Sequence, residues 1–409
     1  MLRCGLLGEK LGHSYSPAIH ALLGEYTYKL YEKKAHELPE FLTAGDFDGL
    51  NVTIPYKKAV IPYCDSLSES AARTGAVNTL VRRADGTLYG DNTDVYGFSY
   101  LLESSGIDAT GKKALVLGSG GASAAVCAAL GDLGAASVIV ISRKGENHYG
   151  NLDRHADTDL IVNTTPVGMY PENGAAPLDL TAFPNCRGVL DVVYNPLRTA
   201  LVLQAEELGI PCDGGLLMLA AQAKRSSELF TGKRLDDGII ERVYKNLLET
   251  MENIVLIGMP GSGKSSTAKL LAERTGRMPA DSDEEIVRRS GMSIPEIFSK
   301  YGEEEFRRRE SAVLKDLGKR SGIILSAGGG CVLREENYGY LRQNGRIVWI
   351  YRDLDALETE GRPLSLGTDL REMFRRRSAL YERFADIRIE NNGTLEQTAE
   401  KIEERLVIR

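Results

Sequence analysis

The sequence predicts an α/β protein built on parallel sheets. Short runs of Val, Ile and Leu alternate with longer amphipathic stretches, and glycine-rich turns separate the two kinds of segment. With 409 residues, 43% of them hydrophobic and 26% charged, the chain has material for two or three domains. No internal repeat or low-complexity stretch interrupts the pattern. We therefore expect successive α/β domains, each with a core of its own.

The early part of the chain shows these elements in order. Strands are expected at Cys4–Leu7 and Leu50–Ile54, followed by a hairpin through Asp85-Gly86. The Ala-rich segment Ala122–Leu133 has helical composition, and Asp236–Met251 reads as a charged amphipathic helix that ends this part. Four apolar runs predict buried parallel strands: Ala114–Leu117, Ser137–Ile141, Leu160–Val162 and Val189–Val193.

The charge distribution argues against a nucleic-acid partner. Up to Thr250 the chain carries 23 basic and 30 acidic residues, and beyond it 27 of each. Phosphate-backbone binding needs a concentrated positive face, which neither part offers. No apolar run approaches the ~20 residues that cross a bilayer, and the opening MLRCGLLGEK is too short for a signal peptide. We expect small-molecule substrates, and neither nucleic acid nor membrane as a partner.

The cysteines and histidines predict no structural metal centre. The six cysteines are scattered without a C-x-x-C pair, and the five histidines form no H-E-x-x-H. Reduced thiols are typical of the cytoplasm, which is the compartment we expect.

A phosphate-binding loop opens a second part of the chain, after a boundary expected near Thr250. Gly258-Met-Pro-Gly-Ser-Gly263-Lys264-Ser265 fits G-x-x-x-x-G-K-[ST], between a strand at Asn253–Ile257 and a helix over Thr267–Arg274. Glycines let backbone N–H groups wrap phosphates, Lys264 neutralises their charge, and the next serine reaches Mg²⁺. The loop predicts a nucleoside triphosphate site in a P-loop NTPase-type fold.

Residues downstream of the loop supply an acceptor site. An acidic pair, Asp281 and Asp283, follows the first helix, and Phe306-Arg-Arg-Arg-Glu310 lies in a long helical segment. Three glycines, Gly328–Gly330, follow a strand at Ile323–Leu325, and Arg362-Pro363 precedes a helix at Arg375–Tyr381. With the phosphate loop, these motifs resemble shikimate kinase along the whole segment from 253 to 409.

That resemblance implies roles for individual residues. Asp283 would hold the acceptor diol, Arg307 and Arg377 would clamp a carboxylate, and Gly329 would line the pocket. Two arginines suit a small carboxylate, and a carboxylate can orient a hydroxyl for in-line attack. Lys264 and Asp283 would be catalytic. The implied metal residues are Ser265 and Asp281, and the implied ATP-binding residues are Gly261, Ser262, Gly263, Lys264, Ser265, Ser266 and Arg362.

The expected lid of this second site departs from the family. The segment from Asp353 to Tyr381 is several residues shorter than most shikimate kinase lids. Glu358, Thr359 and Glu360 replace the basic run that usually precedes the Arg-Pro pair. Arg362 is then the one cation of that loop expected to cover the ATP phosphates.

The first part of the chain, residues 1 to about 245, carries an ordered set of motifs. They are G-H-S-Y-S-P at 12–17, N-V-T-I-P-Y-K at 51–57, G-A-V-N-T at 75–79, G-D-N-T-D at 90–94 and G-G-L-L-M-L-A-A-Q at 214–222. As a complete set they resemble shikimate dehydrogenase. The resemblance implies that Lys57 is the catalytic lysine, paired with Asp94. Ketone reduction needs a hydride donor and a general acid near the carbonyl oxygen, and a lysine beside a carboxylate can donate that proton. The implied substrate residues are Ser14, Ser16, Asn51, Thr53, Lys57, Asn78, Asp94, Tyr194 and Gln222.

A second glycine-rich loop predicts the dinucleotide site. Gly118-Ser-Gly120 supplies the first two glycines of G-x-G-x-x-G, with Ser123 in the third place, between a strand and a helix as in a Rossmann domain. The next strand ends Ser142-Arg143-Lys144 without an acidic residue, and Arg143 suits a 2′-phosphate, so we expect NADP(H). Only about fifteen residues then lead to the next strand, where most relatives have a longer helical excursion. The implied NADP residues are Glu69, Gly118, Ser119, Gly120, Gly121, Ala122, Ser142, Arg143, Lys144, Val192 and Gly215.

Together these interpretations predict a bifunctional enzyme of the shikimate pathway. We expect a substrate-binding domain over 1–97, an NADP-binding domain over 98–250 whose last helices return to the substrate, and a kinase domain over 251–409. Two alternatives stay open: a metabolite-sensing regulator that retains both folds, and a quinate/shikimate dehydrogenase that uses NAD. A sensing regulator should have lost residues such as Lys57 and Asp283, and their presence argues against it. Arg143 argues against a dehydrogenase that uses NAD.

Overall fold

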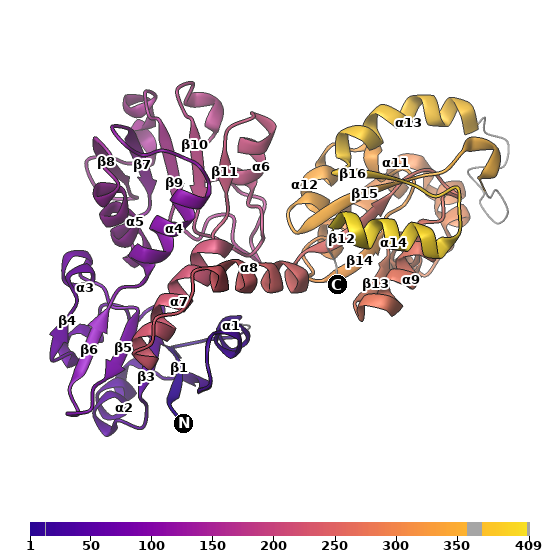
Figure 1. Cartoon of the computed structure of the whole chain (residues 1–409). Coiled ribbons are helices and arrows are strands. Elements are labelled where there is room, and N and C mark those ends of the chain that lie inside the picture. The colour runs from indigo at the N-terminus through magenta and orange to yellow at the C-terminus, as the bar shows by residue number, and fades with distance from the viewer. Residues whose placement is uncertain (13, 358–369, 407–409) are drawn as a thin grey trace. The chain divides into compact units, whose positions relative to one another are not determined.

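Three β-sheets organise the described residues, 1–12, 14–357 and 370–406, in a computed structural model of the chain (Figure 1). The chain divides into two units, Met1–Leu247 with the first two sheets and Leu248–Arg409 with the third. The α/β class that the sequence predicts is confirmed, because the second and third sheets are entirely parallel. Among the described residues, no helix combines the length and the apolar character that a membrane span requires.

The first sheet has the strand order β2-β1-β3-β5-β6-β4. Its strands are β1 (Arg3–Gly8), β2 (Thr27–Glu32), β3 (Gly49–Val52), β4 (Ser66–Leu67), β5 (Thr79–Arg82) and β6 (Leu88–Asp91). The predicted hairpin through Asp85-Gly86 joins β5 and β6, which are antiparallel. The predicted strand Leu50–Ile54 ends earlier, at Val52, because Pro55 has no N–H to continue a ladder. Three helices flank this sheet: α1 (Ser16–Leu23), α2 (Leu38–Ala44) and α3 (Glu69–Thr74).

The second sheet has the order β11-β10-β9-β7-β8. Its strands are β7 (Lys113–Leu117), β8 (Ser137–Ile141), β9 (Leu160–Asn163), β10 (Gly188–Asp191) and β11 (Cys212–Asp213). The strands of dinucleotide-binding sheets usually have the order 3-2-1-4-5-6. In this sheet β8 occupies the position of strand 2, and among the described residues no strand pairs with its outer edge in the position of strand 3. A short 3₁₀ helix, Tyr149–His155, fills the segment between β8 and β9. The short connection noted in the sequence therefore omits one helix and one strand of the usual fold.

Two helices join the two sheets of the first unit. Helix α4 (Asp94–Ser104) leads from the first sheet into β7, and α7 (Leu216–Thr231) returns from β11 and packs against α4. The two backbones approach closely, because a Cβ atom at Gly97 would lie 2.8 Å from the Met218 carbonyl oxygen. The boundary expected between residues 97 and 98 falls inside α4. The remaining helices of this unit are α5 (Gly121–Asp132), α6 (Ala200–Glu207) and α8 (Gly238–Met251).

The third sheet has the order β13-β14-β12-β15-β16, with helices on both faces (Figure 1). Ile254 and Leu256 of the central strand pack with α9 and α14, whereas Val255 and Ile257 face the core shared with α10, α11, α12 and α13. The strands are β12 (Asn253–Ile257), β13 (Met278–Asp281), β14 (Ile323–Ser326), β15 (Gly345–Tyr351) and β16 (Ile387–Glu390). The helices are α9 (Lys264–Thr275), α10 (Ser282–Ser290), α11 (Ile294–Leu317), α12 (Glu336–Arg342), α13 (Leu370–Phe384) and α14 (Leu395–Leu406).

The two units divide within α8, close to the boundary expected near Thr250. The last turn of this helix and Glu252 after it belong to the second unit and bond within it. Gly322 donates its N–H to the Met251 carbonyl oxygen at 3.0 Å, and Arg277 Nη1 donates to the Glu252 carbonyl oxygen at 2.8 Å.

Candidate active sites

A cavity of about 380 Å³ in the first unit gathers the predicted dehydrogenase residues. Its lining comes from the first sheet, from loops that follow strands of the second sheet, and from α7. All of the predicted substrate residues line it: Ser14, Ser16, Asn51, Thr53, Lys57, Asn78, Asp94, Tyr194 and Gln222. Three of the predicted NADP residues, Ala122, Val192 and Gly215, line the same cavity. The structure therefore places all of the predicted substrate residues and three of the predicted NADP residues around one space.

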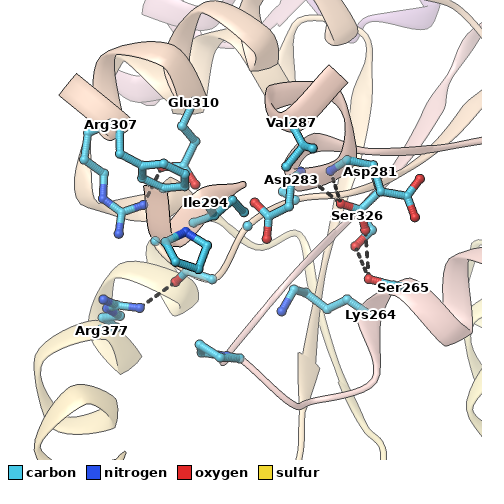
Figure 2. A pocket seen from close by; sticks show the side chains of 18 of the residues that line it. Lys264, Ser265, Asp281, Asp283, Val287, Ile294, Arg307, Glu310, Ser326 and Arg377 are labelled. Atoms are coloured by element: carbon cyan, nitrogen blue, oxygen red, sulfur yellow. Dashed lines mark hydrogen bonds and ion pairs between the residues drawn. The ribbon is translucent and has the colours of Figure 1, made fainter. Parts of the chain in front are cut away.

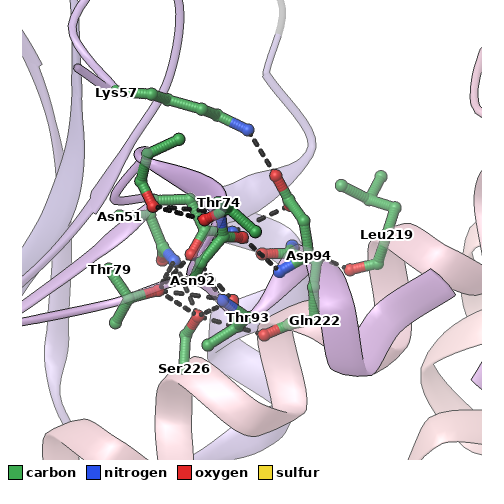
Figure 3. A network of polar contacts seen from close by, with 12 residues as sticks. Asn51, Lys57, Thr74, Thr79, Asn92, Thr93, Asp94, Leu219, Gln222 and Ser226 are labelled. Atoms are coloured by element: carbon green, nitrogen blue, oxygen red, sulfur yellow. Dashed lines mark hydrogen bonds and ion pairs between the residues drawn. The ribbon is translucent and has the colours of Figure 1, made fainter. Parts of the chain in front are cut away.

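Lys57 and Asp94 form the polar centre of this cavity (Figure 3). Lys57 Nζ lies 2.6 Å from Asp94 Oδ2, and Asn78 Nδ2 donates to Asp94 Oδ1 at 2.8 Å. Lys57 follows β3, and Asp94 is the first residue of α4, so the close of a strand and the start of a helix bring the pair together. Both side chains are mostly buried, which strengthens the ion pair relative to one in water.

The cavity is also lined by the serine pair and by Asn51, and hydrogen bonds hold both. Ser16 donates its N–H to Ser14 Oγ at 3.2 Å, which fixes the two hydroxyl-bearing residues relative to each other at the start of α1. The Tyr28 hydroxyl donates to Asn51 Oδ1 at 2.8 Å. Burial raises the Tyr28 pKa well above its ordinary value, so this hydroxyl keeps its proton as a donor.

The glycine-rich loop after β7 has the shape that a dinucleotide pyrophosphate requires. Gly118 has φ +109°, and a side chain there would meet Thr164 Oγ1 at 2.8 Å. Nothing lies within 4 Å of a Cβ atom built on Gly120, so the loop is open in front of the α5 N-terminus. A Cβ atom on Gly121 would lie 3.5 Å from Lys57 Cδ, which brings the loop beside the Lys57–Asp94 ion pair. These residues fit a bound dinucleotide.

The outer NADP residues are divided between two places. Gly118 donates its N–H to the Ile141 carbonyl oxygen at 2.8 Å, so the exposed side chains of Arg143 and Lys144 follow directly beside the loop. Glu69 does not join them. It lines a separate cavity together with Asp132, the last residue of α5. The glycine-rich loop stands at the other end of this helix, just before its first residue.

A second cavity, of about 470 Å³, lies in the second unit (Figure 2). The phosphate loop, β13, α11, the 328–330 loop and α13 all contribute to it. The predicted residues that line it are Lys264, Ser265, Asp281, Asp283, Arg307, Gly329 and Arg377. Figure 2 shows that Lys264 and Asp283 point into this shared space.

The phosphate loop is held in place from several sides. Lys264 is buried, and its Nζ donates to the carbonyl oxygens of Gly258 and Met259 at 3.0 and 2.9 Å. Gly263 has φ +90° and directly precedes α9, which therefore begins at the loop lysine, three residues before the predicted start. Asn391 Nδ2 donates to the Ser262 carbonyl oxygen at 2.8 Å. Gly261 belongs to the same loop, and Ser266 is exposed in the first turn of α9.

Ser265 and Asp281, the residues predicted for the metal, bring hydroxyl and carboxylate oxygens together. Ser265 Oγ donates to Asp281 Oδ2 at 2.8 Å and also lies 3.1 Å from Ser326 Oγ. Hydroxyl and carboxylate oxygens, completed by phosphate and water, are the ligands that Mg²⁺ takes in ATP sites. The residues therefore fit this ion.

Two buried carboxylates meet at the acceptor end of the second cavity. Asp283 Oδ1 and Glu310 Oε1 have no hydrogen-bond partner among the described residues, although buried polar atoms normally have one. Both lie within 3 Å of the position that a Cβ atom on Gly328 would occupy, so they face the same point. Burial, together with the negative charges of Asp281 and Glu310, raises the pKa of Asp283 to about 6. Two unsatisfied acceptors at one point are suited to a ligand that brings hydroxyl groups.

The two arginines that line this cavity come from different helices. Arg307 of α11 is almost fully buried, and its Nη1 donates to Glu310 Oε2 at 2.6 Å. Arg377 of α13 donates to the Gly329 carbonyl oxygen at 3.0 Å, and the buried Tyr381 hydroxyl donates to the same oxygen. The predicted lid residues Glu358, Thr359, Glu360 and Arg362 lie outside the described residues.

Sequence reasoning missed several residues that complete these sites. Glu310 stands three positions after Arg307 on one helix, a spacing that puts both on one face and could have identified it. Thr79, Thr93 and Ser226 lie behind the wall of the first cavity and are buried (Figure 3). The apolar wall of the second cavity was also missed; it consists of Val287, Ile294, Phe306 and Met373.

Fold and sites together define a two-enzyme chain, in which a dinucleotide-dependent oxidoreductase precedes a P-loop phosphotransferase. Family comparisons agree with this class. The family model described as shikimate dehydrogenase substrate binding domain matches residues 6–80, and the model described as shikimate kinase matches residues 260–407.

Comparison with individual proteins identifies the first unit further. A shikimate dehydrogenase (NADP(+)) of Clostridium perfringens strain SM101 is 35% identical over 264 residues, which cover 59% of this chain and 97% of the relative. A chorismate mutase/shikimate 5-dehydrogenase fusion protein of Clostridium acetobutylicum has a similar structure, with a TM-score of 0.57, 35% identity, and coverage of 60% of this chain and 97% of that one. The shikimate 5-dehydrogenase of Thermus thermophilus in complex with NADP(H) and shikimate has a TM-score of 0.55 and 35% identity, over 60% and 99% of the two chains.

The chain belongs to the shikimate dehydrogenase family and carries a shikimate kinase domain after it. It is therefore a bifunctional enzyme of the shikimate pathway that uses NADP and ATP, as the motifs predicted.

Proposed function

We propose that the first unit reduces 3-dehydroshikimate to shikimate with NADPH, and that the second phosphorylates the 3-hydroxyl group of shikimate with Mg·ATP. The observation that carries this proposal is chemical. One cavity pairs a lysine with a carboxylate beside a dinucleotide loop, and the other is lined by two carboxylates and by the lysine of a phosphate loop. The product of the first reaction is the acceptor of the second. The predicted domains, 1–97, 98–250 and 251–409, are part of this proposal.

In the reductase site we assign the proton to Lys57. NADPH supplies the hydride when it is bound. Lys57 Nζ donates a proton to the carbonyl oxygen as the alkoxide develops, and Asp94 stabilises the ammonium form that precedes this transfer. Ser14 and Ser16 hold the substrate carboxylate through their hydroxyl groups. We assign the 2′-phosphate of the cofactor to Arg143 and Lys144, whose exposed side chains flank the loop.

In the kinase site we assign the orientation of the acceptor to Asp283. Its unsatisfied Oδ1 accepts the hydroxyl that attacks the γ-phosphoryl group, and Lys264 stabilises the charge on the transferring phosphoryl oxygens. Arg307 and Arg377 bind the substrate carboxylate. Ser265 and Asp281 hold the metal ion.

Two separate assays test the proposal. The purified chain should oxidise NADPH only when 3-dehydroshikimate is present, and should release ADP only when shikimate is present. NADPH should exceed NADH in kcat/KM. A chain that binds these metabolites without turnover would be the sensing regulator instead.

The kinase activity should depend on pH through Asp283. Its pKa is raised to about 6, and the carboxylate form is the one that accepts the hydroxyl proton. We therefore expect kcat/KM for shikimate to be constant where Asp283 is ionised and to fall at lower pH by up to about tenfold per pH unit, since this parameter reports the groups of the enzyme form that shikimate binds. The profile should be measured from pH 5 to 8.5 at saturating ATP. A plateau that extends down to pH 5 would contradict this role.

The two units should be separable. A fragment of residues 1–248 contains both sheets and every residue of the reductase cavity, so we expect it to reduce 3-dehydroshikimate at a rate within about threefold of the full chain. A fragment that begins at Leu248 keeps the bonds from Met251 and Glu252 to the kinase unit and should phosphorylate shikimate. Inactive or insoluble fragments, beside an active full-length chain, would show that the units depend on each other.

A further inference from the structure

Ser226 lies at the centre of a buried hydrogen-bond network behind the reductase cavity (Figure 3). Its hydroxyl lies 2.8 Å from Asn51 Nδ2, 2.9 Å from Thr79 Oγ1 and 3.0 Å from Thr93 Oγ1. It also donates to the Gln222 carbonyl oxygen at 3.0 Å. Ser226 is fully buried and does not line the cavity, so it reaches the substrate only through these partners.

The hydrogen-bonding capacity of this hydroxyl fixes the direction of the network. A serine hydroxyl has one donor and two acceptor positions. The donor position serves the Gln222 carbonyl oxygen, and one acceptor position takes the Asn51 amide, whose oxygen is already bonded to Tyr28. The second acceptor position takes one of the two threonine hydroxyls. The other threonine is then left to donate elsewhere.

That remaining donor has an acceptor at Asn78. The hydroxyls of Thr79 and Thr93 each lie 3.1 Å from Asn78 Oδ1, which also accepts the Thr93 N–H at 2.8 Å. Two donors on its oxygen orient the Asn78 amide so that its Nδ2 faces Asp94 Oδ1. Asn78 thus donates a hydrogen bond to one oxygen of the Asp94 carboxylate, and Lys57 donates one to the other.

We infer that Ser226 is a positioning residue of the reductase, which holds Asn51 for the substrate and, through the threonines and Asn78, holds Asp94 against Lys57. This inference rests on the proposed function. It assigns a role in the reaction to a residue that touches neither substrate nor cofactor. The network also spans α7, β3, β5 and the start of α4, so a single hydroxyl from α7 sets side chains on three other segments.

The test compares two adjacent serines of α7 in the full-length protein. Ser226→Ala removes the hydroxyl at the centre of the network, whereas Ser227→Ala makes the same change at an equally buried residue that lies beside Tyr26 instead. For Ser226→Ala we expect kcat/KM for 3-dehydroshikimate to fall by about 10–100-fold, as when a supporting group lets reacting groups shift. KM for NADPH should stay within twofold, because no hydrogen bond of the network goes to a residue of the cofactor loop. Ser226→Thr, which restores a hydroxyl, should recover most of the loss.

The outcomes separate this inference from the proposed function. If Ser226→Ala and Ser227→Ala reduce 3-dehydroshikimate equally well, the positioning role is wrong while the function stands. An inactive wild-type chain would overturn both. If Ser226→Ala does not fold, judged by loss of NADPH binding, Ser226→Cys takes its place, because sulfur keeps the size but hydrogen-bonds weakly. Ser226→Cys should also lower kcat/KM for 3-dehydroshikimate, and full activity of this variant would overturn the inference.

Discussion

Replacement of Lys57 by methionine should abolish reduction of 3-dehydroshikimate while the kinase continues to turn over. Lys57 Nζ lies 2.6 Å from Asp94 and is the proton donor that we propose, and general acids of this kind contribute about 10²–10⁴ to a rate. Methionine keeps an unbranched side chain, with sulfur in place of the Lys57 Cδ that lies beside Gly121, so NADPH should still bind with a dissociation constant within about threefold of wild type. Stopped assays of NADPH oxidation, with cofactor fluorescence for binding, measure both quantities.

Lys58→Met is the matched control for this experiment. Lys58 is the next residue in the same turn and is exposed, so its replacement should leave both activities unchanged. If Lys57→Met keeps more than half of the wild-type turnover, another group donates the proton and the assignment is wrong.

Replacement of Asp283 by asparagine should abolish phosphorylation of shikimate. The amide cannot accept the hydroxyl proton, and its NH₂ group would present a donor where the structure presents an unsatisfied acceptor. We expect kcat to fall by about 10²–10⁴ with ATP binding retained. Asp316→Asn, an exposed carboxylate on α11 in a surface ion pair, is the control and should stay active.

Asp283→Asn should also raise the free energy of unfolding of the kinase unit at neutral and higher pH. The folded-state pKa of Asp283 is raised above its ordinary value, so the group favours folding at low pH and loses that contribution as the pH rises through about 6. Asparagine carries no charge to bury, and a shift of this size corresponds to roughly 1–3 kcal/mol at pH 8. Trp349 is the single tryptophan of the chain and lies in β15, so its fluorescence during urea unfolding reports this unit. An unfolding midpoint unchanged between variant and wild type at pH 8 would contradict the raised pKa.

The parts of the site that the sequence could predict are those that motifs carry. Lys57, Asn78 and Asp94 lie in separate motifs, and β3, β5 and the start of α4 bring those motifs together as expected. The phosphate loop could be predicted equally well, because the shape and charge of a triphosphate require its glycines and its lysine. The strand ends were less predictable; β3, for example, stops before Pro55.

The supporting residues could not be predicted in the same way. Ser226, Thr79 and Thr93 are common side chains whose role exists only because α7 packs against the first sheet, a contact between segments more than a hundred residues apart. Glu69 is a residue that was expected near the cofactor on resemblance alone. In the structure it lines another cavity. The missing strand beyond β8 was visible only as a short connection.

The measurement that tests the central claim most directly follows both reactions in one vessel. Purified full-length chain is given 3-dehydroshikimate, NADPH, ATP and Mg²⁺, and products are identified by mass spectrometry while NADPH and ADP are counted. We predict shikimate 3-phosphate as the end product, with one NADPH oxidised and one ADP released for each molecule formed. Lys57→Met should form it only when shikimate is supplied, and Asp283→Asn should stop at shikimate. Wild-type chain that accumulates shikimate and leaves ATP untouched would contradict the claim that one polypeptide carries both activities.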